Sequence, residues 1–252
     1  MSLISAAGTH SALPFLIARL RDGGWTVARP ARSGDEAVET LFFMPRDLME
    51  SERILFEEER LAKTLPALRT IILLSTLSPR YVRALRGRIG KQIVLIDAPV
   101  VGAQRLADGG QVSLLLGGPA DVLDTLAPLF AAMAGSAVRM GDYGTAMAAK
   151  ALQDCLAAAS SAITRSALGW AEAQGIDEQR MLPFLRATFG QGAADGLFDP
   201  AALMPRALPE DNAGEILVKT VESALDKALT GAHLTPPTHL PGALAIRPRH
   251  LH

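Results

Sequence analysis

Short, fully apolar runs alternate with helical patterns through the first half of the chain, and this alternation most restricts the fold. The runs that predict strands are LISAA from Leu3, WTVAR from Trp25, TLFFM from Thr40, TIILLS from Thr70 and IVLIDAP from Ile93. Several of them are apolar throughout, which predicts burial on both faces of the sheet. Strands of this kind separated by helices favour a doubly wound, parallel, Rossmann-like α/β domain.

The spacing of apolar residues predicts helices over residues 11–22, 48–65 and 79–88. Two further strands, VSLLLGG from Val112 and AVRMG from Ala137, complete this part of the chain. We therefore predict a Rossmann-like domain over residues 1–140. Residues 141–252 form a predicted all-α domain, joined to the first by one long helix that begins near Thr145. Shorter helices are expected at 177–188 and 211–229, before an irregular, proline-rich end.

Charge and composition exclude several classes of partner. The net charge is −1 and aromatic residues make up 5% of the chain, so neither a basic surface nor a stacking platform for nucleic acid is expected. The single cysteine, Cys155, excludes an intramolecular disulfide and fits a reducing compartment. No signal peptide or membrane span is recognised, so we expect no membrane association and a cytoplasmic protein. The sequence predicts no metal site.

Ligands of open α/β sheets bind beyond the carboxyl ends of the strands, where the strand order reverses. The residues that follow the first strand are Gly8, Thr9 and His10, and Met44 and Pro45 follow the TLFFM run. We predict that these five residues form the cofactor-binding edge.

Three segments resemble the β-hydroxyacid dehydrogenases, a family that includes 3-hydroxyisobutyrate and 6-phosphogluconate dehydrogenases. STLSPRYVRALRGRI, from Ser75, is similar to the family's serine-threonine segment. DAPVVGAQRLADGGQVSLLLGG, from Asp97, is similar to its substrate-binding segment, and GDYGTAMAAKALQD, from Gly141, to the start of its interdomain helix. The order and spacing of all three agree, and the similarity extends to about Asp226. The resemblance implies a homodimer or a higher homo-oligomer.

The resemblance also implies residue roles. Lys150 matches the family's essential lysine, and a lysine partly removed from water is suited to hold and shuttle the proton of an alcohol. Asp154, one helical turn later, stands where the family has an asparagine, and Lys219 matches a second family lysine. The remaining substrate-binding positions are Ser75, Val101, Gly102 and Ala103, with Val101 in place of a serine.

The dinucleotide fingerprint departs from the family pattern. Gly8 occupies the first glycine position, but His10 and Leu13 occupy the second and third. The second glycine lets the pyrophosphate approach the backbone, so His10 compromises the usual pose. The N–H groups at the helix start, with Thr9, His10 and Ser11, are expected to bind an anion instead. Because VARPARS contains no acid for the ribose, Arg29 and Arg32 favour NADP over NAD.

Three functions follow from these residues. The first is NADP-dependent hydride transfer on a small hydroxy acid or aldehyde, with Lys150 as acid and base. The second is a cofactor-independent lyase or isomerase in which Lys150 and Asp154 act as a pair. The third is a non-catalytic homologue that binds a ligand or a partner.

Overall fold

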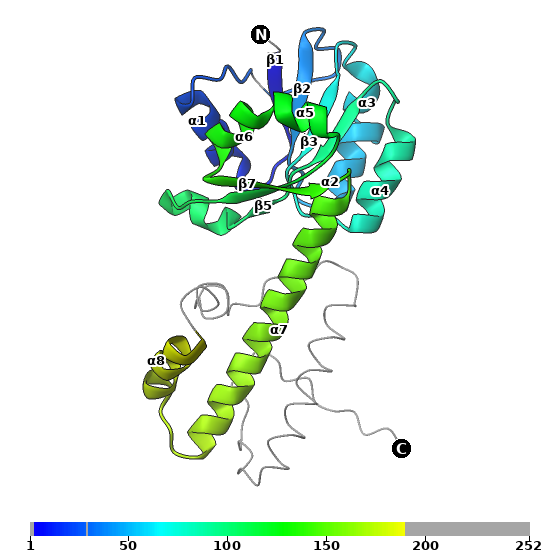
Figure 1. Ribbon diagram of the computed structural model, residues 1–252. Helices are drawn as coiled ribbons and strands as arrows, with labels where there is room; N and C mark the ends of the chain where they lie inside the picture. The colour runs from blue at the N-terminus through cyan, green and yellow to red at the C-terminus, as the bar shows by residue number, and fades with distance from the viewer. Residues whose placement is uncertain (1–2, 29, 190–252) are drawn as a thin grey trace, which may run out of the picture. The chain divides into compact units, whose positions relative to one another are not determined.

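The computed structural model describes residues 3–28 and 30–189 (Figure 1). The strands are β1 (Leu3–Ala7), β2 (Val38–Phe43), β3 (Thr70–Leu73), β4 (Val94–Asp97), β5 (Val100–Val101), β6 (Ser113–Gly117) and β7 (Ser136–Gly141). The α-helices are α1 (Leu13–Asp22), α2 (Leu48–Glu52), α3 (Leu61–Thr64), α4 (Pro79–Arg88), α5 (Ala120–Thr125), α6 (Ala127–Met133), α7 (Thr145–Ala173) and α8 (Glu178–Phe189). One compact unit ends at Leu152 and a second begins at Gln153, whereas the domain boundary at 140/141 stays a prediction.

One sheet in the order β1-β2-β3-β4-β6-β5 forms the centre of the first unit, with β7 beside β6. β1 to β4 are parallel, as predicted. β6 runs antiparallel to β4 and β5, so the sheet is mixed and the prediction of a purely parallel sheet is wrong. The physical reason is the connection from β5 to β6, a 3-10 turn over Ala103–Asp108 that is too short for a crossover helix.

The predicted strand at WTVAR is reduced to a single bridge. Val27 pairs with Ile4 of β1, and the N–H groups of Ala28 and Ala31 donate to the carbonyls of Ile4 and Ala6. Pro30 has no N–H to donate, which prevents a regular ladder. This segment nevertheless lies along the side of β1 opposite β2, so the strand order reverses at β1.

The predicted helix over residues 48–65 is broken. After α2 the chain forms a π-helical turn, Arg53–Glu57, and Arg60 adopts a left-handed conformation with φ of 54°. Arg53 Nη1 donates to Glu58 at 2.7 Å and to Glu59 at 3.1 Å. These two bonds tie the residues after the π-helical turn back to its first residue. The apolar spacing that predicted one helix still fits, because residues on both sides of the break are buried in one cluster.

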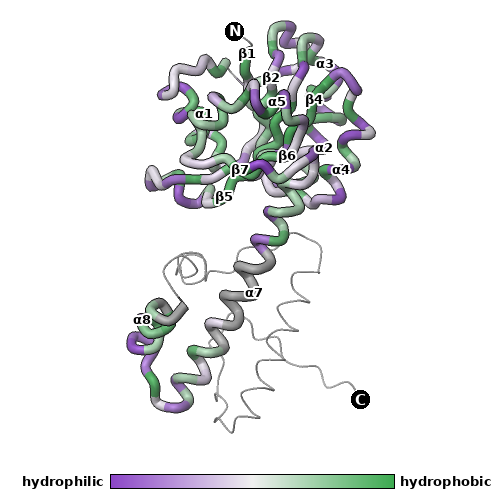
Figure 2. The backbone as a smooth tube through the Cα atoms, viewed as in Figure 1, coloured by the Kyte–Doolittle hydropathy of each residue, from purple (hydrophilic) through white to green (hydrophobic). Residues whose placement is uncertain are grey.

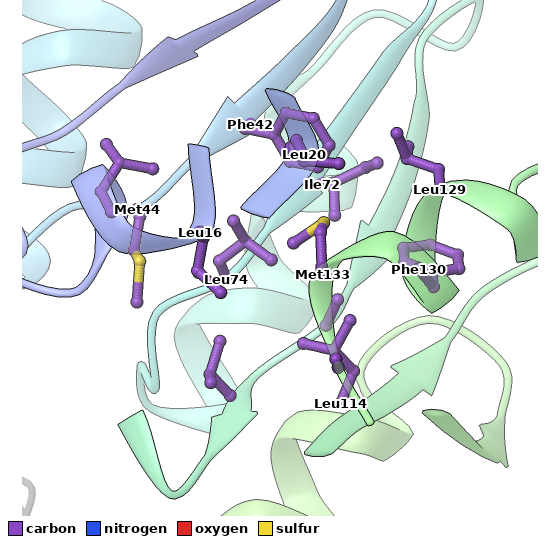
Figure 3. Close-up of a cluster of buried hydrophobic side chains, with 14 of the residues drawn as sticks. Leu16, Leu20, Phe42, Met44, Ile72, Leu74, Leu114, Leu129, Phe130 and Met133 are labelled. Carbon is purple, nitrogen blue, oxygen red and sulfur yellow. The ribbon is translucent and has the colours of Figure 1, made fainter. Parts of the chain in front are cut away.

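Both faces of the sheet are buried along β1 to β4, which confirms the argument from the apolar runs, whereas β7 is exposed along its length. Ile72 and Ile96 pack with α1 and α6 on one face, while their neighbours Ile71 and Leu95 pack with α4 on the other. Figure 3 shows the first of these clusters, and the strands are coloured as hydrophobic in Figure 2. The helices α7 and α8 lie near their predicted positions. The predicted helix at 211–229 and the proline-rich end lie outside the described residues.

A buried carboxylate at the end of β4 fixes the start of α7. Asp97 is fully buried, and its Oδ1 and Oδ2 accept hydrogen bonds of 2.7 Å from the N–H groups of Gly144 and Met147. Burial raises the pKa of the Asp97 carboxyl, and these two hydrogen bonds oppose the rise. Gly117 faces this carboxylate across the sheet, where a Cβ atom would stand 2.2 Å from Asp97 Oδ1. The first turn of α7 is thereby held at the carboxyl end of β4.

The ends of β1 and β2 approach each other so closely that only glycine fits at position 8. Gly8 has φ of 117°, and a Cβ atom there would lie 2.1 Å from the carbonyl oxygen of Met44. The N–H of Met44 donates to Ala7 and that of His10 to Met44, at 2.9 and 3.2 Å. The turn that follows β1 is thus hydrogen-bonded to Met44, the residue after β2.

We expect Asp97→Ala to lower the free energy of unfolding by about 3 kcal/mol, because two buried N–H groups would lose their acceptor. Urea denaturation measures the change. Asp108→Ala, at an exposed position, is the control and should cost less than about 0.5 kcal/mol. Equal losses in the two variants would contradict the anchoring role of Asp97.

We expect Gly8→Ala to lower the free energy of unfolding by about 2–3 kcal/mol, because the new Cβ collides with backbone and φ is positive. Gly34→Ala is the matched control, since Gly34 has φ of 83° and a Cβ atom added there would meet nothing within 4 Å. It should cost only about 1 kcal/mol for the left-handed conformation. Thermal and urea unfolding of both variants measure the two losses. Equal losses would contradict the close approach of Gly8 to the Met44 backbone.

Candidate functional site

Strand order reverses at β1, so the carboxyl ends of β1 and β2 form the topological switch point at which open α/β sheets bind ligands. The structure brings several predicted residues together there. Met44, Pro45 and Ser75 are buried, and the hydroxyl of Ser75 donates to the carbonyl of Pro45. The bond from Ser75 to Pro45 links the chain that follows β3 to the chain that follows β2. In the turn that follows β1, Thr9 is exposed and His10 half-buried, so these two are the more accessible of the predicted residues.

His10 uses part of the helix start that an anion was predicted to bind. Its Nδ1 accepts a 3.1 Å hydrogen bond from the N–H of Ala12, and its carbonyl accepts one of 3.0 Å from Leu13. A neutral imidazole that accepts at Nδ1 carries its proton on Nε2. The N–H groups of Ala12 and Leu13 at the start of α1 are therefore already hydrogen-bonded and are not available to the predicted anion. α1 also begins at Leu13, two residues later than predicted, with Ala12 as its N-cap residue.

Leu13, in the third glycine position, is accommodated. It is 6% exposed and packs in the cluster shown in Figure 3, which also includes Ala6 and Ala12. Small side chains in β1 leave room for this leucine, which stands where the family has a glycine. The departure at this position is therefore compatible with the Rossmann packing of helix on strand.

Thr9 binds an acid that the sequence analysis missed. Its Oγ1 donates to Oε2 of Glu50 at 3.0 Å, and Glu50 is 5% exposed. The sequence signal was the spacing of Asp47 and Glu50, a capping-box pattern directly after a strand. Asp47 Oδ1 accepts the N–H of Glu50 at 2.8 Å and so begins α2. This hydrogen bond lowers the pKa of the Asp47 carboxyl.

Arg32 lies past the segment that runs beside β1. Its side chain is exposed, and its backbone N–H donates to Asp35 at 2.8 Å. The N–H of Ala31 donates to Ala6, so Arg32 follows directly on a residue fixed to β1. Arg29 lies outside the described residues.

The predicted substrate segment begins at the end of β5. Val101 is half-buried, Gly102 has φ of 81°, and Ala103 starts the 3-10 turn. The N–H of Val100 donates to Leu74 at 3.4 Å, which puts the segment at the end of β3, beside Ser75.

Lys150 lies in the second turn of α7 and is 2% exposed. Two contacts of the preceding turn fix its place: Met147 N–H donates to Asp97, and Met147 Sδ accepts the N–H of Leu77 at 3.3 Å. Asp154 is half-buried, one turn further along α7. Lys219 lies outside the described residues.

Two hollows of about 410 and 280 Å³ lie elsewhere in the described part, and their linings include none of the predicted site residues. We place the site at the strand ends because the chemistry-bearing side chains gather there. Within residues 3–28 and 30–189, no three His, Cys, Asp or Glu side chains stand together as metal ligands would. Over the same residues, no helix has the length and apolarity to cross a membrane.

Comparison with known proteins agrees with this geometry. Residues 16–141 match the NAD binding domain of 6-phosphogluconate dehydrogenase, a match that begins just after the turn at which the glycines are replaced. The chain is 25% identical to L-threonate dehydrogenase of Cupriavidus necator over 85% of its own length and 73% of that protein. It is 30% identical to 3-hydroxyisobutyrate dehydrogenase of Pseudomonas aeruginosa over 68% of its length, but spans only 58% of that relative.

A solved structure extends the likeness to nearly the whole chain. The structure of Mycobacterium tuberculosis 3-hydroxyisobutyrate dehydrogenase with L-serine superposes with a TM-score of 0.67 at 19% identity, over 94% of this chain and 89% of that one. At this identity the similarity establishes the fold. The family match covers half of the 252-residue chain and joins the segments from Ser75 and Asp97. The chain therefore belongs to the β-hydroxyacid dehydrogenase family.

Proposed function

We propose that this protein is an NADP-dependent oxidoreductase that transfers hydride between the cofactor and a small hydroxy acid or aldehyde-type substrate. The observation that carries the proposal is the burial of Lys150 on a helix turn anchored to the sheet. An amine in such a place is removed from water, as acid–base chemistry at neutral pH requires. The two relatives named above are dehydrogenases of small hydroxy acids, which supports this substrate class.

The switch point fits a dinucleotide. Gly8 keeps the tight turn after β1 that the fold needs, because a Cβ atom there would collide with the backbone of Met44. The pyrophosphate would lie against His10, whose imidazole stands in for the N–H of Ala12 that it occupies. The exposed guanidinium of Arg32 supports a 2′-phosphate, and hence NADP. Bound NADP supplies or accepts the hydride.

The protein's own residues provide binding and proton transfer. The ammonium of Lys150 donates a proton to the carbonyl oxygen during reduction, and its amine accepts that proton during oxidation. The backbone N–H groups at Gly102 and Ala103 bind the substrate carboxylate, with Val101 as an apolar neighbour. Asp97 positions Lys150 through Met147 without contacting the substrate. Asp154 and Lys219 remain proposed site residues on the resemblance alone.

Neither alternative function gains support from the relatives, whose names describe no lyase, isomerase or non-catalytic protein. We also propose, from the resemblance, that the protein assembles as a homodimer or a higher homo-oligomer and, from its composition, that it is cytoplasmic.

We expect NADPH to bind about tenfold more tightly than NADH, the ratio that corresponds to one charge-assisted hydrogen bond. Arg32→Ala should remove this preference by weakening NADPH alone, because the 2′-phosphate loses its guanidinium. Fluorescence titration and the rise in melting temperature with each cofactor measure the effect. If neither cofactor bound at millimolar concentration, the oxidoreductase proposal would be abandoned.

We expect Lys150→Met to lower kcat by about 10²–10⁴-fold, because the proton donor is lost while the apolar stem is kept. Dissociation constants for NADPH should stay within about twofold, since the amine does not hold the cofactor. Lys91→Met, at an exposed position, is the control. L-threonate, 3-hydroxyisobutyrate and L-serine are the first substrates to assay. An active Lys150→Met enzyme would show that another group moves the proton.

A further inference from the structure

Glu50 is an acid buried at the switch point, and neither the resemblance nor the sequence motifs assign it a role. Its side chain is 5% exposed, although it lies on α2, the first helix after β2. Burial of a carboxylate is costly unless hydrogen bonds compensate for the lost water. The hydrogen bonds that the Glu50 carboxylate accepts therefore indicate its role.

One carboxylate oxygen joins the two turns that border the switch point. Oε2 accepts a 2.6 Å hydrogen bond from the N–H of Arg46 and the 3.0 Å bond from Thr9. Arg46 follows β2 and Thr9 follows β1, so the two strand ends are linked through a single atom. The backbone of Glu50 is fixed in turn by its bond to Asp47.

The other oxygen shows that the carboxylate is poorly suited to stabilising the fold. Among the described residues, Oε1 is buried without a hydrogen bond, and Arg53 Nη2 lies 3.9 Å away. An apolar side chain at this position would avoid that cost. The gain from the carboxylate thus lies in the bonds of Oε2 to Thr9 and Arg46.

The bond from Thr9 determines how its hydroxyl meets a ligand. The hydroxyl proton is directed at Glu50, so the Oγ1 of this exposed residue is left with lone pairs only and acts as an acceptor. It repels a phosphate oxygen and suits an O–H or N–H donor. This corrects the expectation that Thr9 donates to an anion.

We propose that Glu50 is a positioning residue that orients Thr9 to accept a hydrogen bond from a hydroxyl or amide donor of the bound dinucleotide. This inference rests on the proposed function, because it assumes that a nicotinamide cofactor occupies the switch point. Glu50 acts through Thr9 and does not itself touch the cofactor.

The experiment compares Thr9→Val with Thr9→Ser, and Glu50→Met with Glu50→Gln. Thr9→Val and Glu50→Met should each raise the Kd and KM for NADPH about tenfold at unchanged kcat, the effect of one charge-assisted hydrogen bond. Thr9→Ser keeps the hydroxyl and should bind as the native protein does. Glu50→Gln keeps an acceptor and should fall between. The double variant Thr9→Val/Glu50→Met should bind no more weakly than either single variant, because both remove the same contact.

Glu59→Met is the matched control. Glu59 also accepts a hydrogen bond from Arg53, at 3.1 Å, and in the described part of the chain it also buries one oxygen without a hydrogen bond. Its side chain bonds to Arg53 rather than to Thr9 or Arg46, so its loss should leave Kd unchanged. Melting temperatures separate binding from folding, and Thr9, being exposed, tests the proposal even if Glu50→Met fails to fold.

Two results would overturn the inference while the oxidoreductase proposal stands: Thr9→Val binding NADPH as well as Thr9→Ser, or Glu50→Met matching Glu59→Met. If the native protein bound neither NADPH nor NADH, the proposed function itself would fail, and this inference with it.

Discussion

The hydrogen bonds from Gly144 and Met147 to Asp97 are the interaction on which the rest of the site depends. They join the end of a central strand to the first turn of a long helix. A helix start has N–H groups without helical partners, and a carboxylate satisfies two of them at once. Without that link, the turn before Lys150 would lose two hydrogen bonds to β4 and keep the weaker contact of the Met147 sulfur with Leu77. The position of Lys150 therefore depends on the capping of the α7 N-terminus by Asp97.

Much of the first unit could be predicted from the sequence because burial on both faces leaves a clear pattern. Ile71 and Ile72 face opposite layers and are both buried, so the run is apolar without alternation. The failures have local causes that a pattern of apolar residues does not contain. Pro30 stops a ladder, Arg60 takes a left-handed conformation, and a short turn reverses β6. Apolar spacing reports which residues are buried, but not whether the backbone between them is continuous.

The site was predictable in position but less so in chemistry. Strand ends identified Gly8, His10 and Met44, and backbone hydrogen bonds bring these three together. The sequence could not show that Met44 is buried, or that the His10 ring is turned back onto Ala12. Nor did it reveal Glu50, since an acid in a helix is usually solvent-facing. Its burial depends on Thr9, which is forty-one positions away in sequence.

Gly117 gives the anchored helix an unexpected vulnerability. It has no side chain, takes part in no proposed chemistry, and pairs with Asp97 across β4 and β6. The space it leaves open is the space that the Asp97 carboxylate occupies. A methyl group added there would displace the carboxylate, release the first turn of α7 and move an amine on a different element. The position of Lys150 thus depends in part on a residue without a side chain, and mutations that move Lys150 need not fall on any residue of the proposed site.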